Sequence, residues 1–191
     1  AVNVTEQVQH NPLSKAFVRA AQELGVTFVA DFNGAVQEGV SWYDVTQKNA
    51  RRESTATAYL KPIRSRKNLT VLTHALGRKI VVRNGRVTGL DMLINNKPDY
   101  VGVDRELILS SGAVNSPRLL LLSGIGPAEE LQQVGVQVVH DLPGVGKNFQ
   151  DHMDVYLTAE TIPVSYNSSD RPDKAALAGL QYIATKTGPI T

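Results

Sequence analysis

The chain has 191 residues, of which 42% are hydrophobic and 20% are charged. This composition is typical of a folded globular chain and excludes a disordered one. The chain has no cysteine, which excludes a disulfide, a thiolate nucleophile and a cysteine-based metal site. No run of about 18 apolar residues and no signal-peptide pattern is present. We expect a cytoplasmic or membrane-peripheral location and, because residue 1 is alanine, a segment of a longer protein.

The formal net charge is +2, but the basic residues are unevenly placed. Ten lysines and arginines lie between residues 51 and 86, where Glu53 is the single acidic residue. Such a cluster fits either a nucleic-acid surface or a solvated face. Tyr59 is the single aromatic residue of the stretch, so a platform for stacking bases is lacking. We therefore prefer the solvated face and predict no nucleic-acid partner.

The N-terminal part predicts one surface helix over residues 12–24. Asn11 is a typical cap, Pro12 suits the first turn, and Gly25 is a typical stop. The apolar residues recur at helical spacing and predict one apolar stripe. Further on, Trp42 and Tyr43 fit either the lining of a substrate pocket or a small aromatic core, and we prefer the core.

The middle of the chain predicts a second helix and an antiparallel meander. An alanine-rich helix is expected over residues 53–61, followed by a strand over 68–73. Asn84-Gly85 lies between two runs rich in β-branched residues, which is a strong signal for a two-residue hairpin. A third extended piece is expected at 100–104.

The stretch that follows predicts a strand, a turn and a helix. Leu107 to Leu109 form an apolar run too short for a helix, so we predict a buried strand. Gly112 permits a turn with positive φ. Ser116-Pro117 is a typical helix start and Gly124 a typical stop. This geometry directs free N–H groups and the positive end of a helix dipole toward a phosphate-bearing ligand.

The remaining elements are predicted from turn residues and short apolar runs. We expect a helix over 127–134, a strand over 136–139, a glycine-bearing loop over 141–152, a strand from 153 to 159, a loop over 161–174 and a helix over 175–185.

The order of residues after the predicted strand resembles a known signature. Gly112-Ala113, Ser116-Pro117, Leu119-Leu120 and Ser123 to Gly126 are similar to the second signature of the glucose–methanol–choline (GMC) family of flavin oxidoreductases. The stretches Asp31–Leu60 and Pro143–His152 (PGVGKNFQDH) resemble the same family. An ordinary strand–turn–helix crossover is the alternative, and we prefer the family because several stretches agree.

The resemblance implies a fold of the mixed α/β (α+β) class. It implies part of an FAD-binding doubly wound domain with an inserted antiparallel β-meander, plus parts of a substrate-binding domain. We expect residues 1–50 in the substrate-binding domain, 51–150 in the FAD-binding domain and 151–191 back in the substrate-binding domain. This interpretation requires Leu107–Leu109 to be buried. The chain has no Gly-x-Gly-x-x-Gly fingerprint and no C-terminal histidine pair, so we interpret it as an internal segment.

The resemblance also implies FAD as cofactor and oxidation of a primary alcohol or choline-like CH–OH group, with hydride transfer to flavin N5. The expected FAD contacts are Gly77, through its main chain, and Ser111, Gly112 and Ala113. We predict no catalytic residue and no metal site in this segment, which alone should be inactive. His152 fits either catalysis or a hydrogen bond that fixes its loop with Asp151, and we prefer the loop.

Two alternatives to alcohol oxidation remain from the sequence. The first is a redox-inert FAD-containing relative of the hydroxynitrile lyase type, because that family includes such proteins. The second is a non-enzymatic binding module that uses the basic residues 51–86. The electron acceptor and the choice between oxidase and dehydrogenase stay open.

Overall fold

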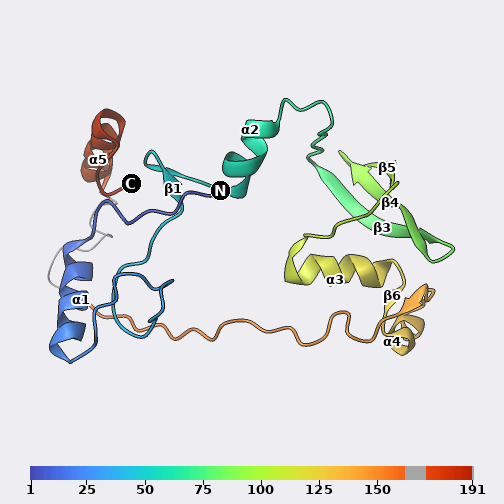
Figure 1. Ribbon diagram of the computed structural model, residues 1–191, viewed down its shortest axis with the longest axis horizontal. Coiled ribbons are helices and arrows are strands. Elements are labelled where there is room, and N and C mark those ends of the chain that lie inside the picture. The colour runs from blue at the N-terminus through green and yellow to red at the C-terminus, as the bar shows by residue number, and fades with distance from the viewer. Residues whose placement is uncertain (162–170, 191) are drawn as a thin grey trace. The chain divides into compact units, whose positions relative to one another are not determined.

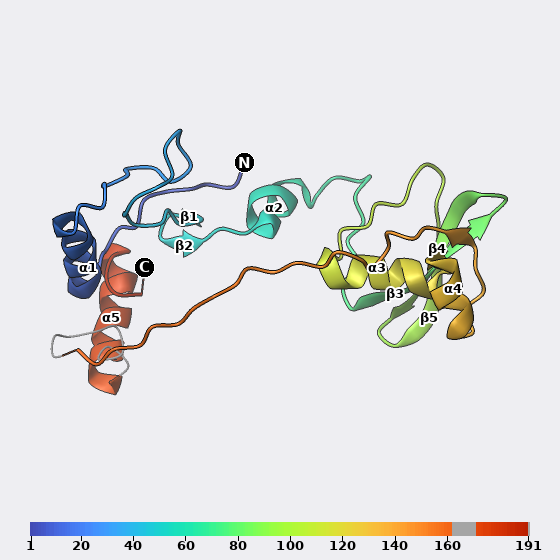
Figure 2. The same ribbon diagram turned by 90° about the horizontal axis from the view of Figure 1, so that it is seen from below.

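The computed structural model describes residues 1–161 and 171–190, in two compact units (Figures 1 and 2). Residues 70–155 form one unit, here called the central unit. Residues 1–69 and the described part of 156–191 form the other, here called the terminal unit. The predicted domain division concerns the domains of the family and stays a prediction. The predicted loop at 161–174 falls largely outside the described residues.

The first helix of the terminal unit, α1, spans Pro12–Glu23 and confirms the predicted caps. The Asn11 side chain accepts a hydrogen bond from the Leu13 N–H at 2.9 Å, and Gly25 has φ +87°. Pro12 has no N–H, but this costs no hydrogen bond, because the N–H groups of the first helical turn have no partner within the helix. The helix lies at the surface, as predicted, and its apolar side is largely exposed, with Phe17 72% exposed and Val18 buried.

A short hairpin and the last helix of the chain meet in the terminal unit. Strands β1 (Gln47–Lys48) and β2 (Arg51–Arg52) are joined by Asn49 and Ala50, both at positive φ. Helix α5 spans Pro172–Thr185, as predicted within three residues. The Tyr182 hydroxyl of α5 donates to the Ala50 carbonyl at 2.8 Å and so ties the helix to the hairpin turn.

The predicted helix at 53–61 is found, with shifted ends. It consists of a π-helical turn, η1 (Ala56–Leu60), and a short α-helix, α2 (Lys61–Ile63). Pro62 was expected to end it but lies in the first turn of α2, where a missing N–H is tolerated.

The central unit contains the predicted meander. Strands β3 (Ala75–Arg83), β4 (Arg86–Ile94) and β5 (Lys97–Gly102) form an antiparallel sheet in that order. Asn84 and Gly85 have φ of 50° and 73°, which confirms the hairpin. Asn95 and Asn96 form the second turn with the same sign of φ.

Helix α3 spans Gly112–Leu122 and packs against β3. Buried Leu119 and Ile80 lie at this contact. Ser123, 1% exposed, follows the helix. Its hydroxyl donates to the Leu119 carbonyl at 2.6 Å and accepts from the Ile80 N–H at 2.8 Å. The hydroxyl therefore links the C-terminal end of α3 to the unpaired edge of β3.

The start of α3 differs from the prediction. The helix begins at Gly112 rather than near Ser116, and Pro117 lies inside it. Ser116 still satisfies a free donor, because its Oγ accepts from the Ser111 N–H at 3.0 Å. Ser116 thus lies in the second turn of the helix, and its side chain satisfies the N–H of the residue that precedes the helix. Gly124 has φ +79° and confirms the predicted stop.

The predicted buried strand at Leu107–Leu109 is wrong. The segment has no strand partner among the described residues, and Ile108 is 74% exposed. A parallel strand is buried by neighbours on both sides, and the described residues supply none here. The strands predicted at 68–73 and 153–159 are likewise absent, and the one predicted at 136–139 is displaced to 140–141.

The last part of the central unit is a small parallel pair with a helix between its strands. Strand β6 (Ile125–Gly126) pairs with β7 (His140–Asp141), and α4 (Ala128–Gln133) connects them. The Asp141 carboxylate accepts from the Ala128 N–H at 3.0 Å and so caps α4. Across the whole described part of the chain, every helix falls short of the length and apolarity that a membrane span requires.

Candidate functional site

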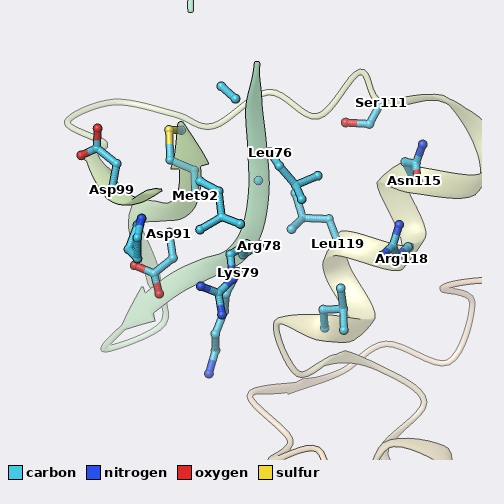
Figure 3. A pocket seen from close by; sticks show the side chains of 15 residues that line it. Leu76, Arg78, Lys79, Asp91, Met92, Asp99, Ser111, Asn115, Arg118 and Leu119 are labelled. Atoms are coloured by element: carbon cyan, nitrogen blue, oxygen red, sulfur yellow. The ribbon is translucent and has the colours of Figure 1, made fainter. Parts of the chain in front are cut away.

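A pocket of about 1010 Å³ lies in the central unit between the sheet and α3 (Figure 3). We call it the sheet–helix pocket. It is lined by the start of β3, the later part of β4, the start of β5 and one side of α3: Ala75–Lys79, Asp91–Leu93, Pro98, Asp99, Ser111, Asn115, Arg118, Leu119 and Leu122. Gly77 and Ser111 were predicted from two separate motifs, and the fold brings both to this pocket.

Gly77 lies at an irregularity of an edge strand. The register of β3 against β4 shifts between Gly77 and Lys79, so Arg78 is the extra residue of a β-bulge. A Cβ at Gly77 would lie 3.6 Å from the Leu119 and Leu90 side chains, an ordinary contact. The position therefore does not require glycine for space, and its main chain is the group available to a ligand.

The walls of the sheet–helix pocket carry both signs of charge. Arg78 comes from β3, Arg118 from α3 and Asp99 from β5 (Figure 3). Lys79 of β3 and Asp91 of β4 also line the pocket, but they pair with each other, so their side chains lie on the face of the sheet opposite to Asp99. No ion pair joins these five side chains in the part of the chain that the structure describes. Cations without a partner, beside the first turn of a helix, form a suitable environment for a phosphate group.

The other two predicted cofactor residues lie elsewhere on α3. Gly112 has the predicted positive φ, +84°, and a Cβ there would meet nothing within 4 Å. It lines neither of the two pockets described here. Ala113 lines a second pocket, of about 820 Å³, which we call the helix–loop pocket. The structure therefore brings together Gly77 and Ser111, but not Gly112 or Ala113, in the sheet–helix pocket.

The helix–loop pocket lies between α3 and the loop 146–150. Gly146 has φ +77°, which favours glycine, and a Cβ there would make an ordinary contact with Leu121 at 3.6 Å. An ion pair between Lys147 and Glu130 fixes the loop to α4. Arg118 and Leu122 of α3 line both pockets. Sequence reasoning missed Arg118 because no motif marks it, although its place after Ser116-Pro117 lies within the signature.

His152 and the aromatic residues near Trp42 lie outside both pockets. The His152 side chain is 100% exposed. The main-chain N–H of His152 donates to Asp151 Oδ1 at 2.8 Å, which supports the loop-fixing interpretation. His10 stacks on Trp42 with ring centroids 4.3 Å apart, and Phe28 meets the same indole edge-on. Trp42 thus belongs to a small aromatic core, whereas Tyr43 is 76% exposed.

Comparison with known proteins gives the family. A family model described as GMC oxidoreductase matches residues 1–154. The chain belongs to the GMC oxidoreductase family. The mixed helix–strand fold class with an antiparallel meander is that of its structural neighbours, so the predicted class is confirmed.

Two relatives and one solved structure show how far the similarity extends. The chain is 48% identical to an alcohol dehydrogenase [acceptor] of Pseudomonas putida, over 95% of this chain and 34% of that protein. It is 39% identical to the mitochondrial choline dehydrogenase of Mus musculus, over 98% of this chain and 32% of that protein. The structure of an FAD-dependent oxidoreductase from Chaetomium thermophilum matches with a TM-score of 0.86 at 28% identity. The match covers 98% of this chain and 34% of that chain. The chain thus spans about a third of the length of these curated relatives.

Proposed function

We propose that the chain is part of an FAD-dependent oxidoreductase of alcohols, and that its sheet–helix pocket binds the adenosine end of FAD. The observation that carries this proposal is the convergence of Gly77 and Ser111 on one pocket with Arg118 in its wall. Family membership supports FAD as the cofactor. Structural neighbours named as FAD-dependent proteins support it as well.

The residues of the pocket suit the chemical groups of an adenine nucleotide. The main chain of β3 at Gly77 would meet the adenine, as the family resemblance implies. Ser111 Oγ and the Arg118 guanidinium would contact the ribose and phosphate groups. Bound FAD would supply the hydride acceptor for alcohol oxidation. In this proposal the chain binds and orients the cofactor, and the catalytic base lies outside the segment.

The proposed substrate is a primary alcohol or a choline-like alcohol. The names of the relatives, a choline dehydrogenase and an alcohol dehydrogenase [acceptor], support oxidation of a CH–OH group. They favour oxidation over the redox-inert, hydroxynitrile lyase type of protein.

The proposed cofactor site can be tested with ADP, which carries the adenosine end of FAD. We expect ADP to shift the NMR amide signals of Gly77 and Ser111 in the ¹⁵N-labelled chain. Arg118→Gln should weaken ADP binding by about tenfold, because a charge-assisted hydrogen bond to phosphate is lost. Arg83→Gln is the matched control, because Arg83 ends β3 and does not line the pocket.

Two results would contradict the proposal. One is an ADP titration that shifts signals elsewhere in the chain and leaves Gly77 and Ser111 unchanged. The other is equal ADP affinity for Arg118→Gln and the control, which would show that the helix side of the pocket makes no contact with phosphate.

A further inference from the structure

Three residues of the sheet–helix pocket form one row across the sheet. Gly77 of β3 pairs with Met92 of β4, and Met92 pairs with Asp99 of β5. Directly paired residues place their side chains on the same face of a sheet. Strands lie about 4.8 Å apart, so the row extends about 10 Å from Gly77 to Asp99. All three residues line the pocket.

The pocket carries a negative charge on β5, at one end of this row, and a positive charge on α3. Asp99 ends the row on β5, and Ser111, Asn115 and Arg118 line the pocket from α3. Figure 3 shows Met92 and Asp99 on one side of β3 and Arg118 on the other. A ligand that fits this arrangement has an anionic group toward α3 and a hydrogen-bond donor toward β5. An adenine nucleotide has both, its phosphate at one end and its exocyclic amino group at the other.

Asp99 has an acceptor available for such a donor. Its Oδ1 accepts from the Tyr100 N–H at 2.7 Å. The side chain is exposed and forms no ion pair in the part of the chain that the structure describes. An ionised carboxylate accepts hydrogen bonds and donates none. Adenine carries an amino donor at the position where guanine and hypoxanthine carry a carbonyl oxygen, so a carboxylate there distinguishes the two kinds of purine.

We propose that Asp99 is a specificity-determining residue of this pocket, which accepts a hydrogen bond from the adenine amino group and rejects 6-oxopurines. The inference rests on the proposed function, because it assumes that the pocket holds an adenine nucleotide. Met92, a largely buried residue, lies between Gly77 and Asp99 in the row.

The test compares ADP with inosine diphosphate (IDP), which carries a carbonyl oxygen and a protonated N1 where ADP carries the amino group and an unprotonated N1. NMR titration of the chain should show ADP binding about tenfold more tightly than IDP, which is typical of a site with one lost hydrogen bond and one unpaired acceptor. Asp99→Asn should bring the ratio of the two affinities near one, because its amide can donate to the oxygen of hypoxanthine. Asp99→Ala should lower ADP affinity toward that of IDP.

Asp91→Asn is the matched control. Asp91 lines the same pocket but pairs with Lys79 and Tyr100, so its side chain lies on the opposite face of the sheet from Asp99. This variant should keep the wild-type ratio of ADP to IDP affinity. The amide spectrum of each variant shows directly whether it is folded.

The outcomes separate this inference from the proposed function. If ADP shifts Gly77 and Ser111 but Asp99→Asn and Asp99→Ala keep the wild-type ratio, the role of Asp99 is refuted and the cofactor pocket stands. A change of ratio in Asp91→Asn equal to that in Asp99→Asn also refutes it, because the effect is then one of charge alone. If neither nucleotide shifts Gly77 and Ser111, both proposals fail.

Discussion

Gly112 and Gly135 form a matched pair of residues. Their φ angles are +84° and +74°, and a Cβ added to either would meet no atom within 4 Å. Valine at either position is strained by about 1–3 kcal/mol, so both Gly112→Val and Gly135→Val should lower the free energy of unfolding. Gly112 follows Ser111, the pocket residue, whereas Gly135 follows the end of α4. We expect the Gly112 change alone to weaken ADP binding.

Chemical denaturation and an ADP titration of the folded fraction measure the two effects separately. Equal ADP affinity of the two variants would identify Gly112 as a structural turn and remove it from the candidate site.

Ser123 is the residue whose loss should destabilise the central unit. Its buried hydroxyl is the acceptor for the Ile80 N–H. Ser123→Ala leaves that donor unsatisfied, and the free energy of unfolding should fall by about 1–3 kcal/mol. Exposed Ser110→Ala is the control and should change it by less than about 0.5 kcal/mol. A denaturant titration that gives both variants the same stability would show that the hydrogen bond contributes nothing.

For single residues, the local sequence predicted the backbone conformation better than it predicted which residues line the pocket. The positive φ of Gly112 follows from a small-residue turn before a helix. Arg118 and Asp99 were missed, because their place in one pocket depends on the meander, which brings residues distant in sequence together. Gly77 was found through the family resemblance rather than through its own chemistry.

Among the elements, those with a local signal formed where predicted. Helix α1 has its own cap and stop residues. The hairpin at Asn84-Gly85 depends only on its turn and on the two strands that the turn connects. The strands predicted at 68–73 and 107–109 also contain apolar runs, but neither segment has a partner strand among the described residues. A strand depends on a neighbour, so its own residues cannot determine whether it forms.

The hairpin of β1 and β2 contains a strained residue that substitution can relieve. Ala50 has φ 58°, a region that costs alanine about 1–2 kcal/mol. Glycine removes this strain but loses about 0.5–1 kcal/mol through chain entropy. Ala50→Gly should therefore raise stability by up to about 1.5 kcal/mol, or roughly 3–6 °C in Tm. The carbonyl that accepts from Tyr182 is kept, since it belongs to the main chain.

Ala58→Gly is the control for this change, because Ala58 lies inside the helical turn η1. Glycine there should lower stability by up to about 1 kcal/mol. A fall in Tm for Ala50→Gly similar to that of Ala58→Gly would mean that the turn does not strain alanine.

For the molecule as a whole, the segment Leu107–Leu109, which lacks a strand partner among the described residues, counts against a complete FAD-binding domain in this structure. The family match over residues 1–154 decides the family. The two results are compatible. The family match depends on the order of residues, whereas burial of this strand requires neighbouring strands. The meander and α3, whose contacts are local to the central unit, form the sheet–helix pocket without that strand.

The last prediction concerns FAD itself and the 191-residue chain. The chain has no Gly-x-Gly-x-x-Gly sequence, the fingerprint that places the pyrophosphate of FAD at a helix N-terminus. In the proposed site, the sheet–helix pocket would contact the ADP part of the cofactor without that fingerprint, so we expect weak binding of ADP and no tightly held FAD. The absorbance spectrum of the purified chain should lack a stoichiometric flavin band near about 450 nm, the region expected for a bound flavin. A stoichiometric band there would show that this chain holds the pyrophosphate by other residues, and the first turn of α3 beside Arg118 would be the place to look for them.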